Sequence, residues 1–327
     1  MEYIRNFKQL SKNDAAIAGG KGSSLGEMVN AGIPVPPGFV LLASAFDRFL
    51  TEADLSSRIE AVMEQIKLNE TGSVDRASKK IQVMILKAKF PEDLARGILN
   101  DFIKLKAPLV AVRSSATAED SLVASWAGEL ESYLNTTKNN LLENIKHCWT
   151  SLFSQRAIVY RFEKKMRKTQ VSVAVVVQKM IQSEVSGVVF TVHPVTENRN
   201  QLVIEAGWGL GEAIVGGKIT PDTYVINKSK IRKFQPKAGP PRAEKVIEDK
   251  NISTQKTMIV GGAKGTVGKP VPKQQQDRQK LTDQQIIDLA KICCKIERLY
   301  GRPQDIEWAL ARGRFYIVQA RPITTLK

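Results

Sequence analysis

The chain has 327 residues and a net charge of +16, from 49 basic and 33 acidic side chains. Its 43% hydrophobic and 25% charged residues are typical of a globular protein large enough for two or three lobes. No apolar run approaches the ~20 residues of a membrane span, and the N-terminus lacks a signal-peptide core. Since Cys148, Cys293 and Cys294 lack metal-ligand spacing, we expect reduced thiols in a cytoplasmic protein.

A glycine-rich turn with a lysine inside it lies near the start of the chain, at residues 18–24. A short amphipathic helix is predicted to follow and to stop at Gly32, with Ser23 or Ser24 as its cap. Glycines, a lysine and a helix N-terminus together suit a phosphate group. The spacing is not that of a Walker A motif, so an ordinary capped turn is the alternative interpretation.

Helices without recognisable chemistry are predicted for most of residues 55–102 and again for 141–165. Consecutive prolines keep residues 34–39 extended, and a short strand is expected at 40–42. His147 lies on the later helical segment beside Cys148, and we expect it to be structural.

Residues 109–120 combine a predicted buried strand, at 109–112, with polar groups that follow it at once. Arg113 offers a planar fork for phosphate, and the small residues after it let backbone N–H groups approach a ligand. An anion site and an ordinary strand-to-loop junction both fit these residues. Adjacent Glu119 and Asp120 are poorly placed to share a metal ion, and we expect them to act as caps.

Two β-branched strands are predicted at 171–177 and 185–191, joined by a short polar turn into a hairpin. A third strand is expected at 201–206. Gln178 ends the first strand, and Glu184 and Glu205 are further polar candidates. An adenine base needs apolar walls and a few amide or backbone groups, which such a sheet provides.

The glycine-rich residues 207–217 have GxGxG spacing, which argues against a dinucleotide fingerprint. A strand is expected at 222–227. Residues 227–280 contain 14 basic and 4 acidic residues, which suits either an acidic partner or a solvated lysine-rich face. With Phe234 as its one aromatic residue, this segment lacks a stacking platform for nucleic acid. We expect a mobile or irregular connection there.

A capping box at Thr282 predicts a helix that runs to Tyr300 and stops at Gly301. Two alternating strands follow at 305–310 and 314–319, joined by a predicted three-residue loop.

That loop would place Glu307 opposite Ile317 and diagonal to Gln319, on the same face of the hairpin. A carboxylate and an amide oxygen suit Mg²⁺, with Arg321 close by for an anion. The alternative interpretation is an ordinary amphipathic hairpin.

Three segments carry a more specific signal: AVRSSATAED followed by SWAGELESYLNT within 111–136, DIEWAL at 305–310 and VQARPIT at 318–324. Together they resemble the nucleotide-binding domain of the phosphoenolpyruvate synthase, pyruvate phosphate dikinase and rifampicin phosphotransferase family. The resemblance runs from about Gly19 to Ile323. It implies an α+β, ATP-grasp-like fold of two lobes, with mixed or antiparallel sheets, flanking helices and nucleotide bound in the cleft between the lobes. We expect lobes at about 1–170 and 171–327.

The resemblance also implies residues that bind ATP, namely Lys21, Arg113, Gly128, Ser132, Gln178, Glu307, Gln319 and Arg321. Lys21, Arg113 and Arg321 would be catalytic, because they neutralise the triphosphate. Glu307 and Gln319 would bind Mg²⁺. His193 falls at a position that varies in the family, so we do not expect it to carry phosphate.

The function implied by the resemblance is transfer of a pyrophosphoryl group from ATP–Mg²⁺ to a histidine on a swivelling domain, with release of AMP. Four residues follow Ile323, so we expect the histidine and second-substrate domains to be absent and supplied by a separate domain or subunit. The final acceptor, pyruvate, rifampicin or another molecule, is left open. Alternatives are a non-catalytic ATP-binding regulatory module that recognises a partner through its basic surface, or the ATP domain of a rifampicin phosphotransferase. We expect no membrane partner and do not favour nucleic acid.

Overall fold

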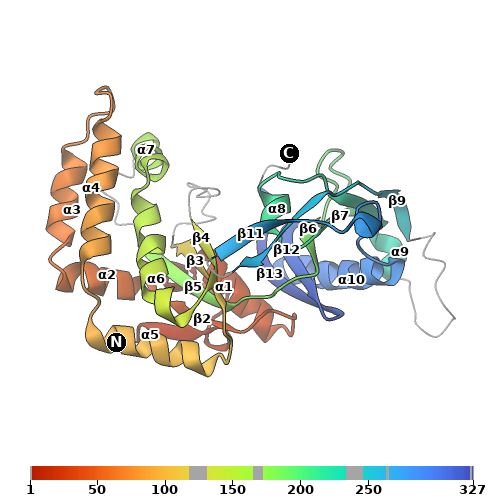
Figure 1. The fold of residues 1–327 in the computed structure, drawn as a ribbon, viewed down its shortest axis with the longest axis horizontal. Coiled ribbons are helices and arrows are strands. Elements are labelled where there is room, and N and C mark those ends of the chain that lie inside the picture. The colour runs from red at the N-terminus through yellow and green to blue at the C-terminus, as the bar shows by residue number, and fades with distance from the viewer. Residues whose placement is uncertain are drawn as a thin grey trace. The chain divides into compact units, whose positions relative to one another are not determined.

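The structure is a computed structural model that describes residues 2–117, 131–164, 172–232, 246–262, 265–324 and 326. Its internal contacts divide the chain into two compact units, whose elements are labelled in Figure 1. The first unit consists of Met1–Glu27 with Pro37–Met180, and the second of Met28–Pro36 with Ile181–Lys327. The short segment Met28–Pro36 therefore belongs to the second unit although its sequence neighbours belong to the first.

The first unit is built on a sheet in which neighbouring strands are antiparallel. In spatial order the strands are β1 (Ile4–Asn6), β2 (Gly38–Leu41), β5 (Val173–Lys179), β3 (Val110–Ala116) and β4 (Ser132–Thr136). The predicted end of β3 at Val112 was too early, because the strand continues to Ala116 and is buried along its whole length. The small residues after Arg113 fit a strand that pairs along both edges, so Arg113 lies inside the sheet rather than in a loop.

Helices cover one face of this sheet, some in direct contact with its strands and others packed on those helices. They are α2 (Ala43–Glu52), α3 (Ser56–Glu64), α4 (Ser73–Lys87), α5 (Glu92–Lys104), α6 (Leu141–Thr150) and α7 (Gln155–Glu163). Strand residues such as Val112 and Val175 form one buried cluster with apolar residues of these helices. Within it, the ring of Trp149 lies 4.7 Å from that of Phe49 and 5.1 Å from that of Phe90. The other face of the sheet carries the polar groups considered below.

The second unit contains a larger antiparallel sheet. In spatial order its strands are β13 (Arg314–Pro322), β12 (Gln304–Ala311), β6 (Val185–Phe190), β7 (Gln201–Trp208), β8 (Asp222–Asn227) and β9 (Ile247–Asn251). β10 (Thr257–Gly262) and β11 (Gly265–Pro270) form a separate ribbon. The helices of this unit are α8 (Glu212–Val215), α9 (Lys228–Arg232) and α10 (Asp283–Tyr300).

The boundaries of α10 confirm the prediction made from its capping signals. Thr282 and Gln285 form a reciprocal capping box, and the helix ends at Gly301 with a φ of 67°. One side of α10 is buried and contacts β7 and β12. No helix within the described ranges combines the length and apolar character that crossing a membrane requires. Short 3₁₀ helices complete the elements, at η1 (Phe7–Gln9), η2 (Lys12–Asp14), η3 (Lys138–Asn140), η4 (Ser151–Phe153) and η6 (Lys273–Gln275).

The predicted hairpin of 171–177 and 185–191 was wrong. Both strands exist, as β5 and β6, but β5 pairs with β2 and β3 whereas β6 pairs with β7 and β12. The short polar link between them joins two different sheets, because each strand finds both of its neighbours elsewhere in the chain. The predicted third strand is confirmed as β7, which does pair with β6.

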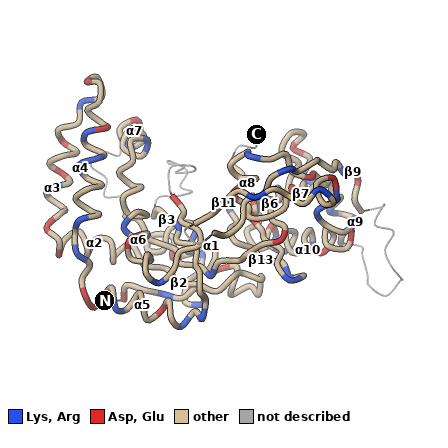
Figure 2. The backbone as a smooth tube through the Cα atoms, in the orientation of Figure 1, with Lys and Arg blue, Asp and Glu red and all other residues tan. Residues whose placement is uncertain are grey.

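The basic segment 227–280 is more regular than predicted, since β9, β10 and β11 lie within it; residues 233–245 are outside the described ranges. Several of its lysines pair with carboxylates, and Figure 2 shows acidic residues interspersed among the basic ones. The Lys280–Asp222 pair is fully buried, with 2.7 Å between Nζ and Oδ1. Asp222 also accepts hydrogen bonds from the Tyr224 hydroxyl and the backbone N–H of Ser253. This network fastens the end of the segment to β8.

Candidate functional site

Lys21 lies on α1 (Ala15–Asn30), directly after a break in that helix. At Gly19 the backbone leaves the helical conformation, with φ 70° and ψ 172°, and a new helical turn starts after it. The N–H groups of Lys21 and Gly22 donate to the side-chain oxygen of Ser115 on β3, at 3.1 and 3.3 Å. A strand residue therefore caps the helix that carries Lys21.

The prediction that Ser23 or Ser24 caps this helix was wrong. The hydroxyl of Ser23 donates to the carbonyl of Gly20, one turn back in the same helix. Because the cap comes from a residue 94 positions away, no local pattern could have revealed it. Two N–H groups at this helix start are hydrogen-bonded to Ser115 and so are not available to a phosphate.

Arg113 is 8% exposed and lies on the same face of the first sheet as α1. It is directly opposite Ser132 of β4 and Val176 of β5. Val176 is in turn opposite Val40 of β2, which a Cβ atom added to Gly22 would approach to 3.1 Å. α1 therefore packs on the face that presents Arg113 and Ser132.

Gln178 shares this face, because it stands opposite Ala111 of β3 and Gly38 of β2. Its side chain is 2% exposed, and its amide nitrogen is buried without an acceptor among the described residues. Buried polar groups are nearly always hydrogen-bonded in folded proteins. The orphaned amide is thus suited to an acceptor that a ligand brings.

Gly128 and Ser132 were also expected to line the nucleotide. Gly128 lies outside the described residues, together with Glu119 and Asp120. Ser132 is exposed at the start of β4, beside Glu131, whose carboxylate accepts a hydrogen bond from the Tyr133 hydroxyl. Burial and that carboxylate raise the pKa of Tyr133 well above its usual value.

In the second unit, the hairpin β12–β13 differs from the predicted register. Ala311 pairs with Arg314, so the connection is the two-residue turn Arg312–Gly313, with φ values of 51° and 71°. Both residues with positive φ indicate a type I′ turn, which matches the twist of the strands better than the predicted three-residue loop.

Within this hairpin the strand register shifts between Glu307 and Trp308. Trp308 pairs with Ile317 and Glu307 with Gln319, so β13 has one extra residue at this point. The predicted pairing of Glu307 with Ile317 was therefore wrong. Glu307 stands directly opposite Gln319, closer than the diagonal position expected from the sequence.

Arg321 is held by a neighbour that the sequence interpretation did not single out. Its Nε and Nη2 donate to Asp305 Oδ2, at 2.9 and 2.8 Å. The two residues are opposite each other in the hairpin. Burial raises the pKa of Asp305, Arg321 opposes that rise and Glu307 adds to it. The signal was present in the sequence, since the period of a strand puts residues 305 and 307 on one face.

The same face extends across the sheet to Glu205. Gln319, Glu307, Val188 and Glu205 occupy consecutive positions of one cross-strand row over β13, β12, β6 and β7. Burial raises the pKa of Glu205, and the negative charge of Asp305 contributes. Three carboxylates thus share a half-buried face, which favours a cation.

The donor set of this hairpin fits Mg²⁺. Glu307 and Gln319 offer hard oxygen ligands side by side, and the described ranges contain no cluster of three or more acidic, histidine or cysteine side chains that could enclose a metal. Mg²⁺ is usually held by one or two carboxylates with waters and substrate phosphates rather than by an all-protein cage. Gln319 is 7% exposed and lies opposite Glu307 in the hairpin.

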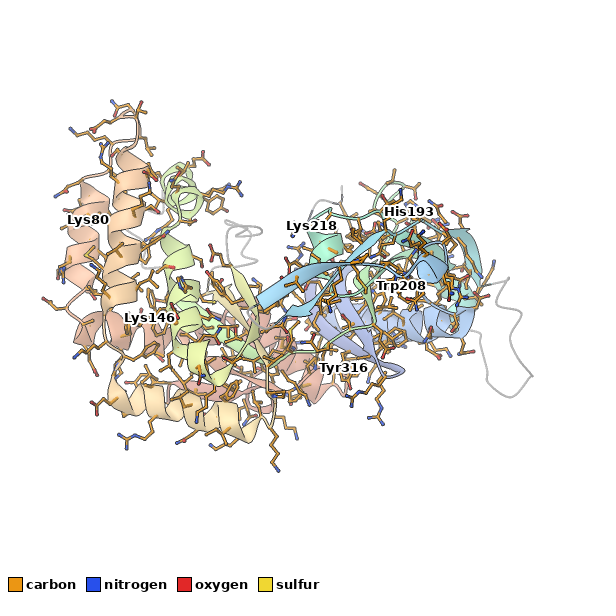
Figure 3. The ribbon with its side chains drawn as sticks, viewed as in Figure 1. Lys80, Lys146, His193, Trp208, Lys218 and Tyr316 are labelled. Atoms are coloured by element: carbon orange, nitrogen blue, oxygen red, sulfur yellow. The ribbon has the colours of Figure 1, made fainter. Side chains whose placement is uncertain are left out.

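Neither histidine has the surroundings of a nucleophile. His193, labelled in Figure 3, accepts hydrogen bonds at Nδ1 from the backbone N–H groups of Val195 and Thr196, at 3.3 and 3.2 Å. His147 lies on α6 with its ring 5.5 Å from that of Tyr133. His193 thus accepts hydrogen bonds from the turn that follows it.

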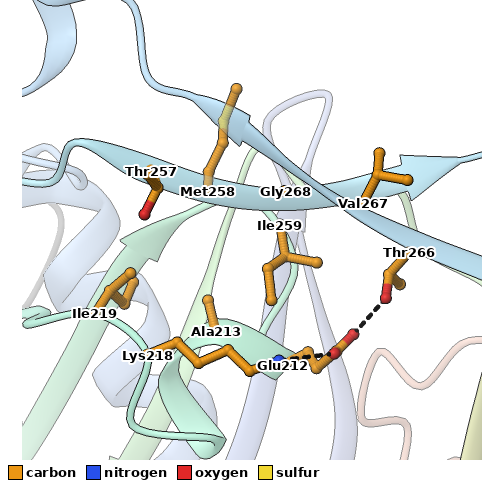
Figure 4. A pocket seen from close by; sticks show the side chains of 10 residues that line it. All are labelled: Glu212, Ala213, Lys218, Ile219, Thr257, Met258, Ile259, Thr266, Val267 and Gly268. Carbon is orange, nitrogen blue, oxygen red and sulfur yellow. Dashed lines mark hydrogen bonds and ion pairs between the residues drawn. The ribbon is translucent and has the colours of Figure 1, made fainter.

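A cavity of about 330 Å³ lies within the second unit, between α8 and the ribbon β10–β11 (Figure 4). Glu212 accepts a hydrogen bond from Thr266 at 2.8 Å and pairs with Lys218 at 3.3 Å. None of the expected site residues lines this cavity. Its polar side chains bond to one another across its wall, so we do not assign the nucleotide to it.

The α+β fold with antiparallel sheets is consistent with a nucleotide-binding domain of the ATP-grasp type. The sequence matches the family described as pyruvate phosphate dikinase, AMP/ATP-binding domain, over residues 15–327. The chain belongs to this family. The resemblance, the α+β fold with antiparallel sheets and the ATP-binding class expected from the sequence are thereby confirmed.

Its relatives are much longer proteins. The chain is 44% identical to a probable phosphoenolpyruvate synthase of Methanocaldococcus jannaschii, over 100% of the chain and 27% of the relative. It is 38% identical to the phosphoenolpyruvate synthase of Pyrococcus furiosus, over 99% of the chain and 44% of the relative. It is 39% identical to a rifampicin phosphotransferase of Bacillus cereus, over 99% of the chain and 36% of the relative. The chain thus spans less than half the length of these relatives.

Proposed function

We propose that the chain, as one nucleotide-binding domain, binds ATP with Mg²⁺ and positions the triphosphate for transfer of its β- and γ-phosphoryl groups to a histidine on a separate domain or subunit. A histidine nitrogen would form a bond to the β-phosphorus, the bond from that phosphorus to the α,β-bridging oxygen would break, and AMP would leave. The relatives named phosphoenolpyruvate synthase and rifampicin phosphotransferase support this class of reaction. They leave the final acceptor open.

The observation that carries the proposal is the buried amide of Gln178, which has no acceptor among the described residues and shares a face with Arg113. The base of a nucleotide presents acceptors to such an amide, while the phosphates of the nucleotide bind cations. Lys21 and Arg113 would bind the phosphates, and Ser132 and Gly128 would line the nucleotide.

The second unit offers residues suited to a metal ion and to phosphate. Glu307 and Gln319 would hold Mg²⁺, which supplies positive charge to the phosphate oxygens when bound. Arg321 would meet the phosphates in the orientation that Asp305 imposes. The contribution of this chain would be charge and position, which dominate catalysis of phosphoryl transfer.

A partner-binding role for the basic segment has less support. Lys228, Lys250 and Lys280 each pair with a carboxylate, so their charge is compensated within the unit. The three free and buried cysteines agree with the reducing, cytoplasmic location expected from the sequence.

Calorimetric titration with a non-hydrolysable ATP analogue, with and without Mg²⁺, tests the proposal. We expect saturable binding of one nucleotide per chain that tightens when Mg²⁺ is present. Absence of binding at millimolar nucleotide would contradict it. Transfer of label from β-labelled ATP to the histidine domain of a related phosphoenolpyruvate synthase would then test the reaction itself.

A further inference from the structure

The side chain of Ser115 uses its full hydrogen-bonding capacity on one turn of α1. Its hydroxyl oxygen accepts from the N–H groups of Lys21 and Gly22, at 3.1 and 3.3 Å, and it donates to the carbonyl of Ala18 at 3.0 Å. A serine hydroxyl has one proton and two lone pairs, and all are engaged here. Ser115 is fully buried. Its interaction with this turn is therefore shielded from competing water.

The turn approaches β3 so closely that only glycine fits at position 19. A Cβ atom added to Gly19 would lie 2.2 Å from the hydroxyl oxygen of Ser115 and 2.4 Å from its backbone carbonyl. Gly19 also has a φ of 70°, where side chains are strained. The start of the helix is thereby seated against the strand at Ser115.

β3 carries both Ser115, which binds the start of the helix, and Arg113. Ser115 and Arg113 are two residues apart on the same strand and point to the same face, a separation of about 6.6 Å along the strand. We propose that Ser115 is a positioning residue, which sets the distance between the two phosphate-binding cations by fixing the backbone of Lys21 to the strand that carries Arg113. This inference rests on the proposed ATP site and assigns it a residue that contacts no phosphate itself.

A neutral cap suits this position better than the carboxylate that often serves at helix starts. Aspartate caps helices as well as serine does. A carboxylate at residue 115, however, would place a negative charge beside the backbone of Lys21 and on the face that carries Arg113, where it would lower the attraction of this region for phosphate. A hydroxyl orders the helix start and leaves the positive charge of the face unchanged.

A double-mutant cycle tests the inference, with affinity for the ATP analogue in the presence of Mg²⁺ as the readout. We expect Ser115→Ala to weaken binding about tenfold, the effect of losing a helix cap. In a Lys21→Ala background the same substitution should change binding less than twofold, because Ser115 acts through Lys21. Equal effects of Ser115→Ala in both backgrounds would overturn the inference, since a general structural role would weaken binding with or without the lysine.

Two further variants make the cycle decisive. Ser115→Cys nearly keeps the volume and replaces the alanine variant in the cycle if that variant does not fold. Sulfur is a weak acceptor, so binding should still fall several-fold. Parental affinity in Ser115→Cys would overturn the inference. Ser114→Ala is the matched control, because this neighbouring buried serine faces the opposite side and donates to the carbonyl of Glu131. Its affinity should stay within twofold of the parent.

The cycle also separates this inference from the proposed function. If Lys21→Ala leaves the affinity unchanged, the ATP site itself is misassigned. If Lys21→Ala weakens binding but Ser115→Ala does not, the ATP site stands and the positioning role falls.

Discussion

The two units present opposite kinds of charge on their candidate faces. In the first unit, the cations Lys21 and Arg113 share a face with neutral groups, Ser115 and Gln178 among them. In the second unit, Asp305 and Glu307 dominate the candidate face, and the guanidinium of Arg321 pairs with Asp305.

Under the proposed function, the two faces bind different ligands. A face that presents cations and neutral hydrogen-bonding groups suits phosphate, whereas a face with more carboxylates than cations repels phosphate until a metal ion is present. An arginine that pairs with a carboxylate, as Arg321 pairs with Asp305, offers less net positive charge to an anion. The first unit should govern affinity for the nucleotide as such, and the second should govern its dependence on Mg²⁺.

Arg113→Ala should have the largest effect on ATP affinity of the three substitutions considered. We expect ATP affinity to fall about 10- to 100-fold, because hydrogen bonds to charged groups contribute about 1.5–3 kcal/mol. The loss should be the same with and without Mg²⁺, as measured by calorimetric titration. Arg48→Ala is the matched control, since Arg48 pairs with Asp93 at the surface of the same unit and should leave binding unchanged. A loss at Arg113 confined to the Mg²⁺ condition would contradict the division between the units.

Glu307→Gln should act in the complementary way. The tightening of ATP binding that Mg²⁺ produces should shrink about tenfold, the effect of losing about 1.4 kcal/mol. Binding without Mg²⁺ should not weaken, because the substitution removes a negative charge from the face. Glu248→Gln, on β9 at the far edge of the same sheet, is the control and should retain the full Mg²⁺ effect. Equal weakening under both conditions would argue against metal binding at Glu307.

Glu205→Gln gives the smallest expected effect and concerns stability. Because burial raises the pKa of Glu205, its ionised form is less favourable in the folded chain than in the unfolded chain. Its contribution to stability is present below the unfolded pKa of about 4.3 and is lost as pH rises through the higher folded pKa. Glu205→Gln should therefore stabilise the chain by about 0.5 kcal/mol at neutral pH and have less effect near pH 4. Urea unfolding at both pH values measures this, and a larger gain at the acidic pH would show the sign to be wrong.

Local sequence signals determined several elements and the family. Thr282 and Gly301 fixed the ends of α10, because capping hydrogen bonds join residues three or four positions apart. The apolar run before Arg113 indicated β3, although not its full length. The segments around Arg113, Glu307 and Arg321 indicated the AMP/ATP-binding domain family, which the comparison over residues 15–327 confirmed.

Contacts between distant residues were decided by the tertiary structure. The Ser115 cap on α1 joins residues 94 positions apart, and β5 and β6 belong to different sheets although a few residues separate them. The pairing of Glu307 with Gln319 depends on a two-residue turn and a bulge that alternation of polar and apolar residues does not specify. Helix caps and strand patterns depend on residues close together in the chain, and the family is recognised from short motifs. The sequence by itself therefore determined the elements and the family. Strand partners, register and the pairing of Arg321 with Asp305 depend on how whole sheets and their cores pack, and only the tertiary structure decided them.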